Sequence, residues 1–150
     1  MVNVPDPELQ IDTLMSTNVG DPRIREKGRL LLVGSCMPGR YPDIVREFKD
    51  RNGGFFAVQV CLEEIHINQA GFKIGSIISY SDVRTVTVLT VDGSPHCVQL
   101  HFVIEDIKRH FQPGVHVEHF VVEKGRVHKI SAKAVKQARH LSKIQSMIGS

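Results

Sequence analysis

The chain has 150 residues, of which 41% are hydrophobic and 23% charged, with a formal net charge of +3. This size and composition are typical of one globular domain with extensions, long enough to bury a core. No apolar run approaches the roughly 20 residues of a membrane helix, and the N-terminus lacks the pattern of a secretory signal. The three widely spaced cysteines, Cys36, Cys61 and Cys97, predict free thiols in a reducing compartment, which favours nucleus or cytoplasm.

The N-terminal third is expected to combine an arm with a strand–helix–strand unit. Residues 1–28 are proline-rich and aperiodic, so we expect an extended arm. Residues 29–33 form a short apolar run, which is typical of a buried strand. Residues 42–51 carry apolar side chains at helical spacing between a Pro-Asp start and an Asn-Gly-Gly stop. Residues 55–67 then predict a second strand, interrupted by Glu63-Glu64.

The stretch from Phe72 to Ile130 is expected to be a β-meander, because short apolar runs alternate with turn signals such as Asp92-Gly93 and Lys124-Gly125. Alternation is clearest at 97–104, where Val98, Leu100, Phe102 and Ile104 would share one face of a strand and Cys97, Gln99 and His101 the other. Residues 105–111 read as one or two helical turns. The expected strands are 72–80, 84–91, 97–104, 115–122 and 126–130.

The C-terminal segment predicts one amphipathic helix over residues 131–148, with a narrow apolar stripe and a basic opposite face. An isolated helix of this length is marginal in water, so the stripe must be buried against something. We expect a protein partner, acidic or helical and different from this chain, because the basic face disfavours pairing with an identical copy. The alternative is that the stripe caps the domain in the monomer. The stripe comprises Val135, Ala138, Leu141, Ile144 and Ile148.

No metal site or other cofactor site is expected, although the chain has eight histidines. His116 and His119 are three apart on an expected strand, so their side chains leave opposite faces. Cys97 and His101 share a face of their expected strand but would lie about 13 Å apart at about 3.3 Å per residue. No C-x-x-C or H-x-x-x-H pattern occurs.

The loop at residues 34–39 follows a strand and precedes a helix, a place where nucleophiles and phosphate-binding loops often lie. It matches neither the G-x-S-x-G nor the P-loop pattern. No sequence pattern nominates a base for Ser35 or Cys36, and Glu63 and Glu64 would point to opposite sides of a strand. A tight turn is the simpler interpretation, and we expect no catalytic residue and no enzyme.

The outward positions of the expected strands and turns mix cations with flat rings, which suits stacking on bases and contact with phosphates. This favours single-stranded nucleic acid as a ligand, while the ordinary alternative is a solvated strand surface. The candidate contacts are Lys73, Tyr80, Arg84, His101, Lys124, Arg126 and Lys129.

The order of elements resembles an OB-fold barrel, in which a helix lies between the third and fourth of five strands. The residues that carry the resemblance are RTVTVLTVDGSPHCVQLHFV, EDIKRHF and QPGVHVEHFVVEKGRVHKI. With its trailing helix, the chain looks like the small OB-fold subunits of single-strand-binding and telomere-capping complexes. The resemblance implies a mainly β fold, with a barrel over 29–130 and a helix over 131–150. It also implies a nuclear, non-enzymatic subunit in genome maintenance, acting in telomere protection or single-stranded DNA binding.

Two alternatives remain open. In a pleckstrin-homology-like barrel, residues 72–89 would enter a strand corner and the C-terminal helix would cap the barrel. Such a domain would be an adaptor that binds a peptide or a phosphoinositide. The Pro113-Gly114 hairpin after a helical insert fits that barrel poorly, so the OB-like fold is preferred. The third alternative is a small enzyme that uses the loop at 34–39.

Overall fold

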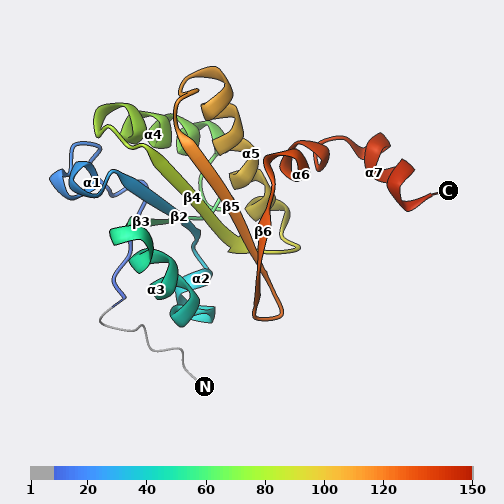
Figure 1. Ribbon diagram of the computed structural model, residues 1–150, viewed down its shortest axis with the longest axis horizontal. Coiled ribbons are helices and arrows are strands. Elements are labelled where there is room, and N and C mark those ends of the chain that lie inside the picture. Colours follow the sequence, from blue (N-terminus) through green and yellow to red (C-terminus); the bar gives the residue numbers. More distant parts are fainter. Residues whose placement is uncertain (1–8, 150) are drawn as a thin grey trace.

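The computed structural model describes residues 9–149, which form a single six-stranded sheet with helices on both faces (Figure 1). The strand order is β1-β3-β2-β4-β5-β6, and every neighbouring pair is parallel except the β5–β6 hairpin. The strands are β1 (Asp12–Thr13), β2 (Arg29–Gly34), β3 (Phe56–Val60), β4 (Thr85–Val91), β5 (His116–Glu123) and β6 (Arg126–Ile130).

Helices connect the parallel strands, because a parallel connection needs a crossover that a tight turn cannot supply. The helices are α1 (Pro22–Lys27), α2 (Met37–Arg40), α3 (Pro42–Asp50), α4 (Ile67–Tyr80), α5 (Pro95–His110), α6 (Ala132–Gln137) and α7 (Leu141–Ile148), with a 3-10 turn at Arg51–Gly53. None of the helices within residues 9–149 is long and apolar enough to cross a membrane.

The prediction of a mainly β barrel is wrong, for the OB-like and for the pleckstrin-homology-like version alike. Two of the expected strands, 72–80 and 97–104, lie inside α4 and α5. A short apolar run does not by itself distinguish a strand from a buried helix segment. In α5 the buried residues are Leu100, His101, Ile104 and Ile107, which is the spacing of one helix face.

The helix starts are built into the sequence by capping residues. Ser94 is the N-cap of α5, where its hydroxyl accepts from the Cys97 N–H, and Pro95 occupies the first turn. His66 caps α4 in the same way, with Gln69 bonding back to the His66 N–H. The Asp-Gly-Ser-Pro segment predicted as a strand–strand turn is therefore the loop that leads from β4 into α5.

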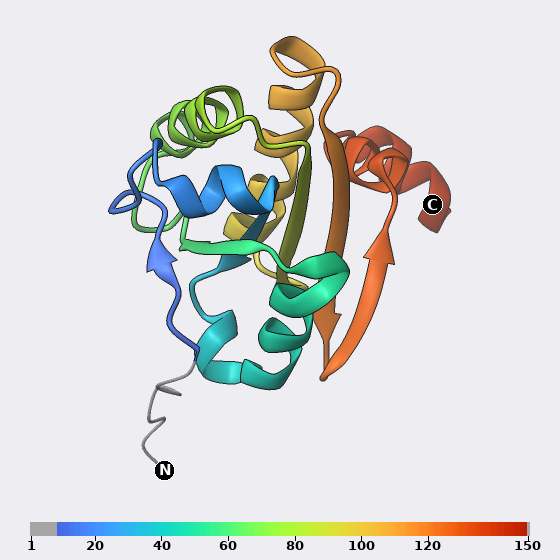
Figure 2. The same cartoon turned by 60° about the vertical axis from the view of Figure 1, so that its left-hand side comes forward.

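The sheet separates two hydrophobic cores. Leu30, Leu32, Val58, Val86 and Val88 face α4 and α5, whereas Leu31, Val33, Ala57, Leu89 and Phe120 face α2 and α3. Strands buried on both faces read as continuous apolar runs without alternation, which explains why 29–33 and 84–91 could be recognised as strands. Figure 2 shows the helices of the two layers on opposite sides of the sheet.

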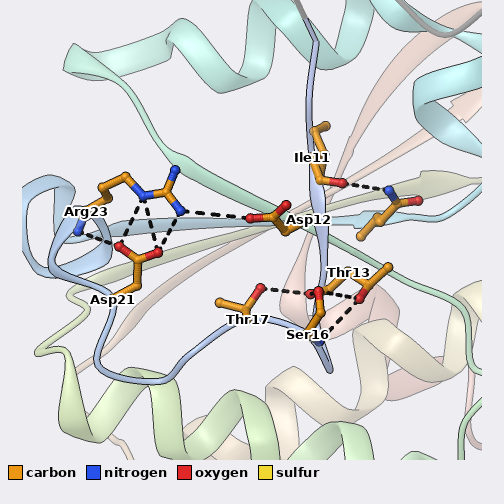
Figure 3. Close-up of polar contacts among 8 residues, drawn as sticks. Ile11, Asp12, Thr13, Ser16, Thr17, Asp21 and Arg23 are labelled. Carbon is orange, nitrogen blue, oxygen red and sulfur yellow. Dashed lines mark hydrogen bonds and ion pairs between the residues drawn. The ribbon is translucent and has the colours of Figure 1, made fainter. Parts of the chain in front are cut away.

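The extended arm expected over 1–28 lies partly outside the described residues, which begin at residue 9. Within 9–28 the chain forms β1 and α1 and packs on the domain. β1 pairs with β3, and the Gln59 side-chain amide donates to the Ile11 carbonyl at 2.8 Å (Figure 3). The Asp21 side chain caps α1 by accepting a hydrogen bond from the Arg23 backbone N–H. Its Oδ2 also accepts from the Arg23 guanidinium, with 2.7 Å between Oδ2 and Nη2. These hydrogen bonds from Arg23 hold the pKa of the Asp21 carboxyl below its usual value.

The single helix expected over 131–148 is two helices. His140 adopts an extended conformation, with φ −112° and ψ 91°, and this residue interrupts the helical path between α6 and α7. α6 packs on α5, where Val135 is buried, and Arg139 pairs with Asp106 at 2.8 Å. α7 projects away from the sheet (Figure 1) and leaves Leu141 80% exposed.

Candidate functional site

The carboxyl ends of β2 and β4 meet at the point where the connections diverge to opposite faces of the sheet. After β2 the chain enters α2 and α3 on one face, and after β4 it enters α5 on the other. β2 and β4 are hydrogen-bonded neighbours, so no helix covers the gap between their ends. In open α/β sheets, ligands bind in the crevice formed at such a switch point.

A crevice of about 150 Å³ lies at this switch point, and we call it the switch-point crevice. It is lined by residues that follow β2, β3 and β4 and by the first turns of α5. All three cysteines of the chain line it, although they are far apart in sequence. The other side chains that could take part in chemistry there are Ser35, Glu63, Thr90, Ser94 and His96.

Gly34 brings the floor of the crevice close to α5. A Cβ at Gly34 would lie 3.6 Å from the Cys97 Sγ and 3.9 Å from the Thr90 Cβ. The Cys97 thiol and the Thr90 side chain therefore both pack near the Gly34 backbone, at distances that are ordinary van der Waals contacts for a Cβ. Gly34 is the last residue of β2, so the sheet itself fixes this geometry.

The three thiols differ in environment. Cys36 is exposed at the start of α2, whereas Cys61 and Cys97 are half-buried. Burial raises the pKa of the Cys97 thiol, and hydrogen bonding to Ser94 opposes this effect in part. Cys97 therefore carries its proton at neutral pH, while Cys36 is the thiol that a solute reaches first.

A chain of four hydrogen-bonded side chains runs from the crevice through the interior. Thr90 Oγ1 lies 2.9 Å from His101 Nε2, His101 Nδ1 lies 2.8 Å from His119 Nδ1, and His119 Nε2 lies 2.6 Å from Glu105 Oε2. Thr90, His101 and His119 are buried, and the Glu105 carboxyl is partly exposed. We call these four residues the polar chain.

The polar chain joins three elements. Thr90 lies near the end of β4, and His119 lies on β5, where it pairs in register with Val88 of β4. His101 and Glu105 are four residues apart on α5, so they share one helix face. Burial, and secondly the neighbouring His119, lowers the pKa of His101 to about 3, so this imidazole is neutral at pH 7.

The candidate nucleic-acid contacts do not form one surface. Lys73 and Tyr80 lie on α4, and Arg84 precedes β4 at the opposite end of the strand from the crevice. His101 is buried in the polar chain. The remaining three candidates belong to the β5–β6 hairpin: Lys124, Arg126 and Lys129. The DNA-binding assignment rested on the cations and rings of the expected strand faces and on the barrel resemblance, and the telomere assignment on that resemblance alone. Neither is supported by the observed fold.

The candidate partner contacts divide between two surroundings. Val135 lies on α6 on the side that packs on α5, and its side chain is buried, so it belongs to the domain core. Ala138 is exposed, and Ile144 is partly buried on α7. Leu141 and Ile148 are 80% and 74% exposed, so they contact little of the rest of the described chain.

The sequence analysis missed the polar chain because residues 97–104 were taken as a strand. On a helix, Cys97, His101 and Glu105 follow one another at intervals of four and share a face. The signal C-x-x-x-H-x-x-x-E was therefore present, and the expected 13 Å separation of Cys97 and His101 is wrong. His101 was expected to point outward with Gln99, whereas it is buried.

Other cavities and clusters offer less chemistry. A larger groove of about 770 Å³ between α4 and α5 is mainly apolar and lined by Phe72, Tyr80 and Phe111, with neither cysteine nor histidine. Among residues 9–149, no group of three or more His, Cys, Asp or Glu side chains is arranged to hold a metal ion.

Comparison with known proteins agrees with the doubly wound architecture. No curated protein and no solved structure matches the chain. One family model does match, over residues 21–149, and it describes a Rossmann-like domain. This match covers all the elements from α1 to α7, including β2, β4 and the crevice between their ends. The chain therefore belongs to the Rossmann-like domain family.

Proposed function

We propose that the chain performs thiol chemistry on a small ligand in the switch-point crevice. The observation that carries the proposal is the convergence of all three cysteines, from three separate segments, on one crevice at the carboxyl edge of the sheet. This is the edge at which open α/β sheets bind their ligands. The ligand class that fits is a small disulfide or a similar soft electrophile, since thiolates attack such groups.

A dinucleotide fits this site poorly. The dinucleotide fingerprint needs glycines at G-x-G-x-x-G, where the second glycine admits the pyrophosphate. The segment after β2 has only Gly34 and Gly39, with Cys36 where that second glycine would stand. The crevice volume of about 150 Å³ is also below the roughly 300 Å³ at which drug-sized ligand pockets begin.

The proposed reaction is thiol–disulfide exchange. The Cys36 thiolate attacks one sulfur of a small disulfide, the S–S bond breaks, and the departing thiolate takes up a proton to leave as a thiol. A mixed disulfide then links Cys36 to the ligand. A second crevice thiol, Cys97 or Cys61, attacks the Cys36 sulfur and releases the other half of the ligand as a thiol. The final product is an intramolecular disulfide.

Incubation with 2-hydroxyethyl disulfide, a small disulfide, followed by intact-mass and peptide mapping, tests this function. We expect one mixed disulfide on Cys36 at first and an intramolecular disulfide later. Cys36→Ser should slow both products. The protein unfolded in urea is the control, because its three thiols should react alike. If the folded protein reacts at Cys36, Cys61 and Cys97 independently and forms no internal disulfide, the proposal is wrong.

We also propose that α7 is an assembly element for a different protein. Its exposed apolar side chains, Leu141, Met147 and Ile148, support this role, and an isolated helix of eight residues is unstable in water without a partner. Leu141→Asp combined with Ile144→Asp should leave the circular dichroism of the β-sheet domain unchanged and abolish stoichiometric co-purification of the partner. Loss of the domain fold in this variant would contradict the assignment.

A further inference from the structure

The polar chain connects the switch-point crevice with a second surface. At one end Thr90 lines the crevice with the three thiols. At the other end Glu105 lines a groove between α5 and α6. Between them His101 and His119 are 5% and 1% exposed, although His101 also borders a cavity lined by residues of α5, the β5–β6 hairpin and α6. A continuous set of hydrogen bonds therefore crosses a nearly buried region.

The hydrogen-bond polarity of this chain follows from its two ends. The ionised Glu105 carboxylate can only accept, so His119 Nε2 donates to it at 2.6 Å. With a single proton on each ring, His119 accepts at Nδ1 and His101 Nδ1 is the donor across 2.8 Å. His101 Nε2 is left as an acceptor, and the Thr90 hydroxyl donates to it at 2.9 Å. Every proton thus points from the crevice toward Glu105.

We propose that Thr90, His101, His119 and Glu105 form a proton-transfer chain that serves the thiols of the switch-point crevice. This inference rests on the proposed thiol chemistry and deepens it. A proton that a thiol releases into the crevice is taken up at Thr90 Oγ1 while the Thr90 proton moves to His101 Nε2. The Nδ1 proton of His101 moves to His119 Nδ1, and the Nε2 proton of His119 moves to Glu105.

Every proton is accounted for, and neither buried imidazole becomes charged. The crevice thiol becomes a thiolate and Glu105 becomes a neutral carboxylic acid, while both imidazoles remain neutral and change tautomer. The hydrogen bonds now all point from Glu105 toward the crevice. The next transfer must therefore run backward and return the proton to the crevice, where the departing thiolate of the exchange reaction takes it up. One chain supplies the base for the attack and the acid for the departure.

Charged groups lie both at the Glu105 end and beside the middle of the polar chain. Asp106 and Arg109 of α5 line the groove with Glu105. Asp92, Glu123 and His128 line a neighbouring cavity that His101 borders. The α6 side contributes the cations Lys133, Lys136 and Arg139 together with His140.

The helix spacing supports the connection to the thiols. Cys97, His101 and Glu105 lie at intervals of four on α5, and residues four apart on a helix are neighbours on its surface. A Gly34 Cβ would lie 3.6 Å from the Cys97 Sγ and 3.9 Å from the Thr90 Cβ and Cγ2, while the Thr90 hydroxyl is hydrogen-bonded to His101 and the Cys97 sulfur is hydrogen-bonded to Ser94 and the Val91 backbone. Cys97 therefore lines the crevice next to Thr90 without a direct hydrogen bond to its hydroxyl, and we assign Cys97 as the thiol that the chain serves.

The rate of intramolecular disulfide formation, started with 2-hydroxyethyl disulfide and measured as a function of pH, tests this proposal. At pH 7 Glu105→Gln and Thr90→Val should lower the rate about 10²-fold, the lower end of the usual effect of general acid–base groups. Thr90→Ser keeps the hydroxyl and should restore the rate. Asp106→Asn is the matched control, since Asp106 is adjacent on the same helix but outside the chain.

The pH profile separates proton transfer from a structural role. Above the raised pKa of Cys97, hydroxide removes the thiol proton, so the variants should recover the wild-type rate. A rate deficit that persists at high pH, or a Glu105→Gln variant as fast as wild type at pH 7, overturns the proposal. Should Thr90→Val fail to fold by circular dichroism, Glu105→Gln against Asp106→Asn decides alone.

A second measurement distinguishes failure of this inference from failure of the proposed thiol function. Nitrogen-15 NMR of the imidazoles at pH 7 should show the proton on Nδ1 of His101 and on Nε2 of His119. A proton on Nε2 of His101 overturns the proposed polarity, whatever the thiols do. If wild type forms no disulfide with Cys97, the proposed thiol function is wrong. The role of the proton-transfer chain in deprotonating Cys97 is then wrong as well.

Discussion

Charging of His101 should destabilise the fold in acid. Burial, followed by the nearby His119, lowers the pKa of His101 to about 3 from an ordinary value of 6.5. The unfolded chain therefore binds a proton that the folded chain does not between about pH 6.5 and 3, and stability falls as pH falls through this window. A pH unit costs about 1.4 kcal/mol for one such group once the unfolded imidazole is fully protonated. Because that imidazole is half protonated at pH 6.5, lowering the pH from 6.5 to 4.5 should remove roughly 2.3 kcal/mol.

Urea unfolding at several pH values between 7.5 and 4.5 measures this effect. His101→Gln keeps a donor and an acceptor in the polar chain but cannot be protonated. The slope of its unfolding free energy against pH should therefore be smaller than that of wild type by the equivalent of about one bound proton. Its absolute stability will also fall because the amide replaces the ring imperfectly, so the slope is the quantity to compare. His110→Gln, at the exposed end of α5, is the control. Parallel pH profiles for wild type and His101→Gln would refute the reasoning.

Three further predictions concern packing and turns. Leu100→Ala should cost about 2–5 kcal/mol by urea unfolding because Leu100 is buried on α5, whereas exposed Gln99→Ala should cost under about 0.5 kcal/mol; equal costs would contradict the helical register. Deleting 141–150 should leave the urea midpoint unchanged, since α7 is exposed, and a clear drop would reveal an unrecognised contact. Gly125→Ala should cost about 1 kcal/mol because Gly125 has φ +77°, while Gly114→Ala, with open space around its Cβ position, should cost less; equal unfolding free energies would mean that the turn tolerates a side chain.

The strands of the sheet could be predicted from the sequence where local signals and burial agree. After Arg29 and Arg84, residues 29–33 and 84–91 contain only aliphatic residues and threonine, which fits β2 and β4 being covered on both faces. The hairpin between 115–122 and 126–130 was recognised from Lys124-Gly125, and both turn residues have positive φ. The helix at 42–51 was also predicted, and α3 occupies Pro42–Asp50.

The two misassigned helices show where sequence patterns become ambiguous. Val98, Leu100, Phe102 and Ile104 alternate as in a strand, but only Leu100 and Ile104 are fully buried, together with His101. α5 buries a wide face against the sheet, and a wide apolar face on a helix can imitate alternation over eight residues. The decisive signals were Ser94 and Pro95, an N-cap and a first-turn proline, which were interpreted as a turn between strands.

The candidate site was less accessible to sequence reasoning than the fold. The crevice needs residues from three βα junctions, and only the relative order of β2, β3 and β4 brings Cys36, Cys61 and Cys97 together. The polar chain also needs the β4–β5 register, which places His119 opposite Val88. A shift of that register by one residue would turn His119 to the other face of the sheet and break the chain.

Stability alone is a weak explanation for the polar chain. Buried polar groups contribute little net free energy compared with apolar residues of similar volume, because their desolvation offsets their hydrogen bonds. A valine at 90 and leucines at 101 and 119 would fill much of the same space between α5 and the sheet. The chain instead places a hydroxyl, two imidazoles and a carboxylate in series, with distances of 2.6 to 2.9 Å and one end among three thiols. Simultaneous replacement of all four by apolar residues should therefore leave the domain folded while the crevice thiols lose their pH-dependent reactivity, and it is this separation of folding from reactivity that assigns the chain to function.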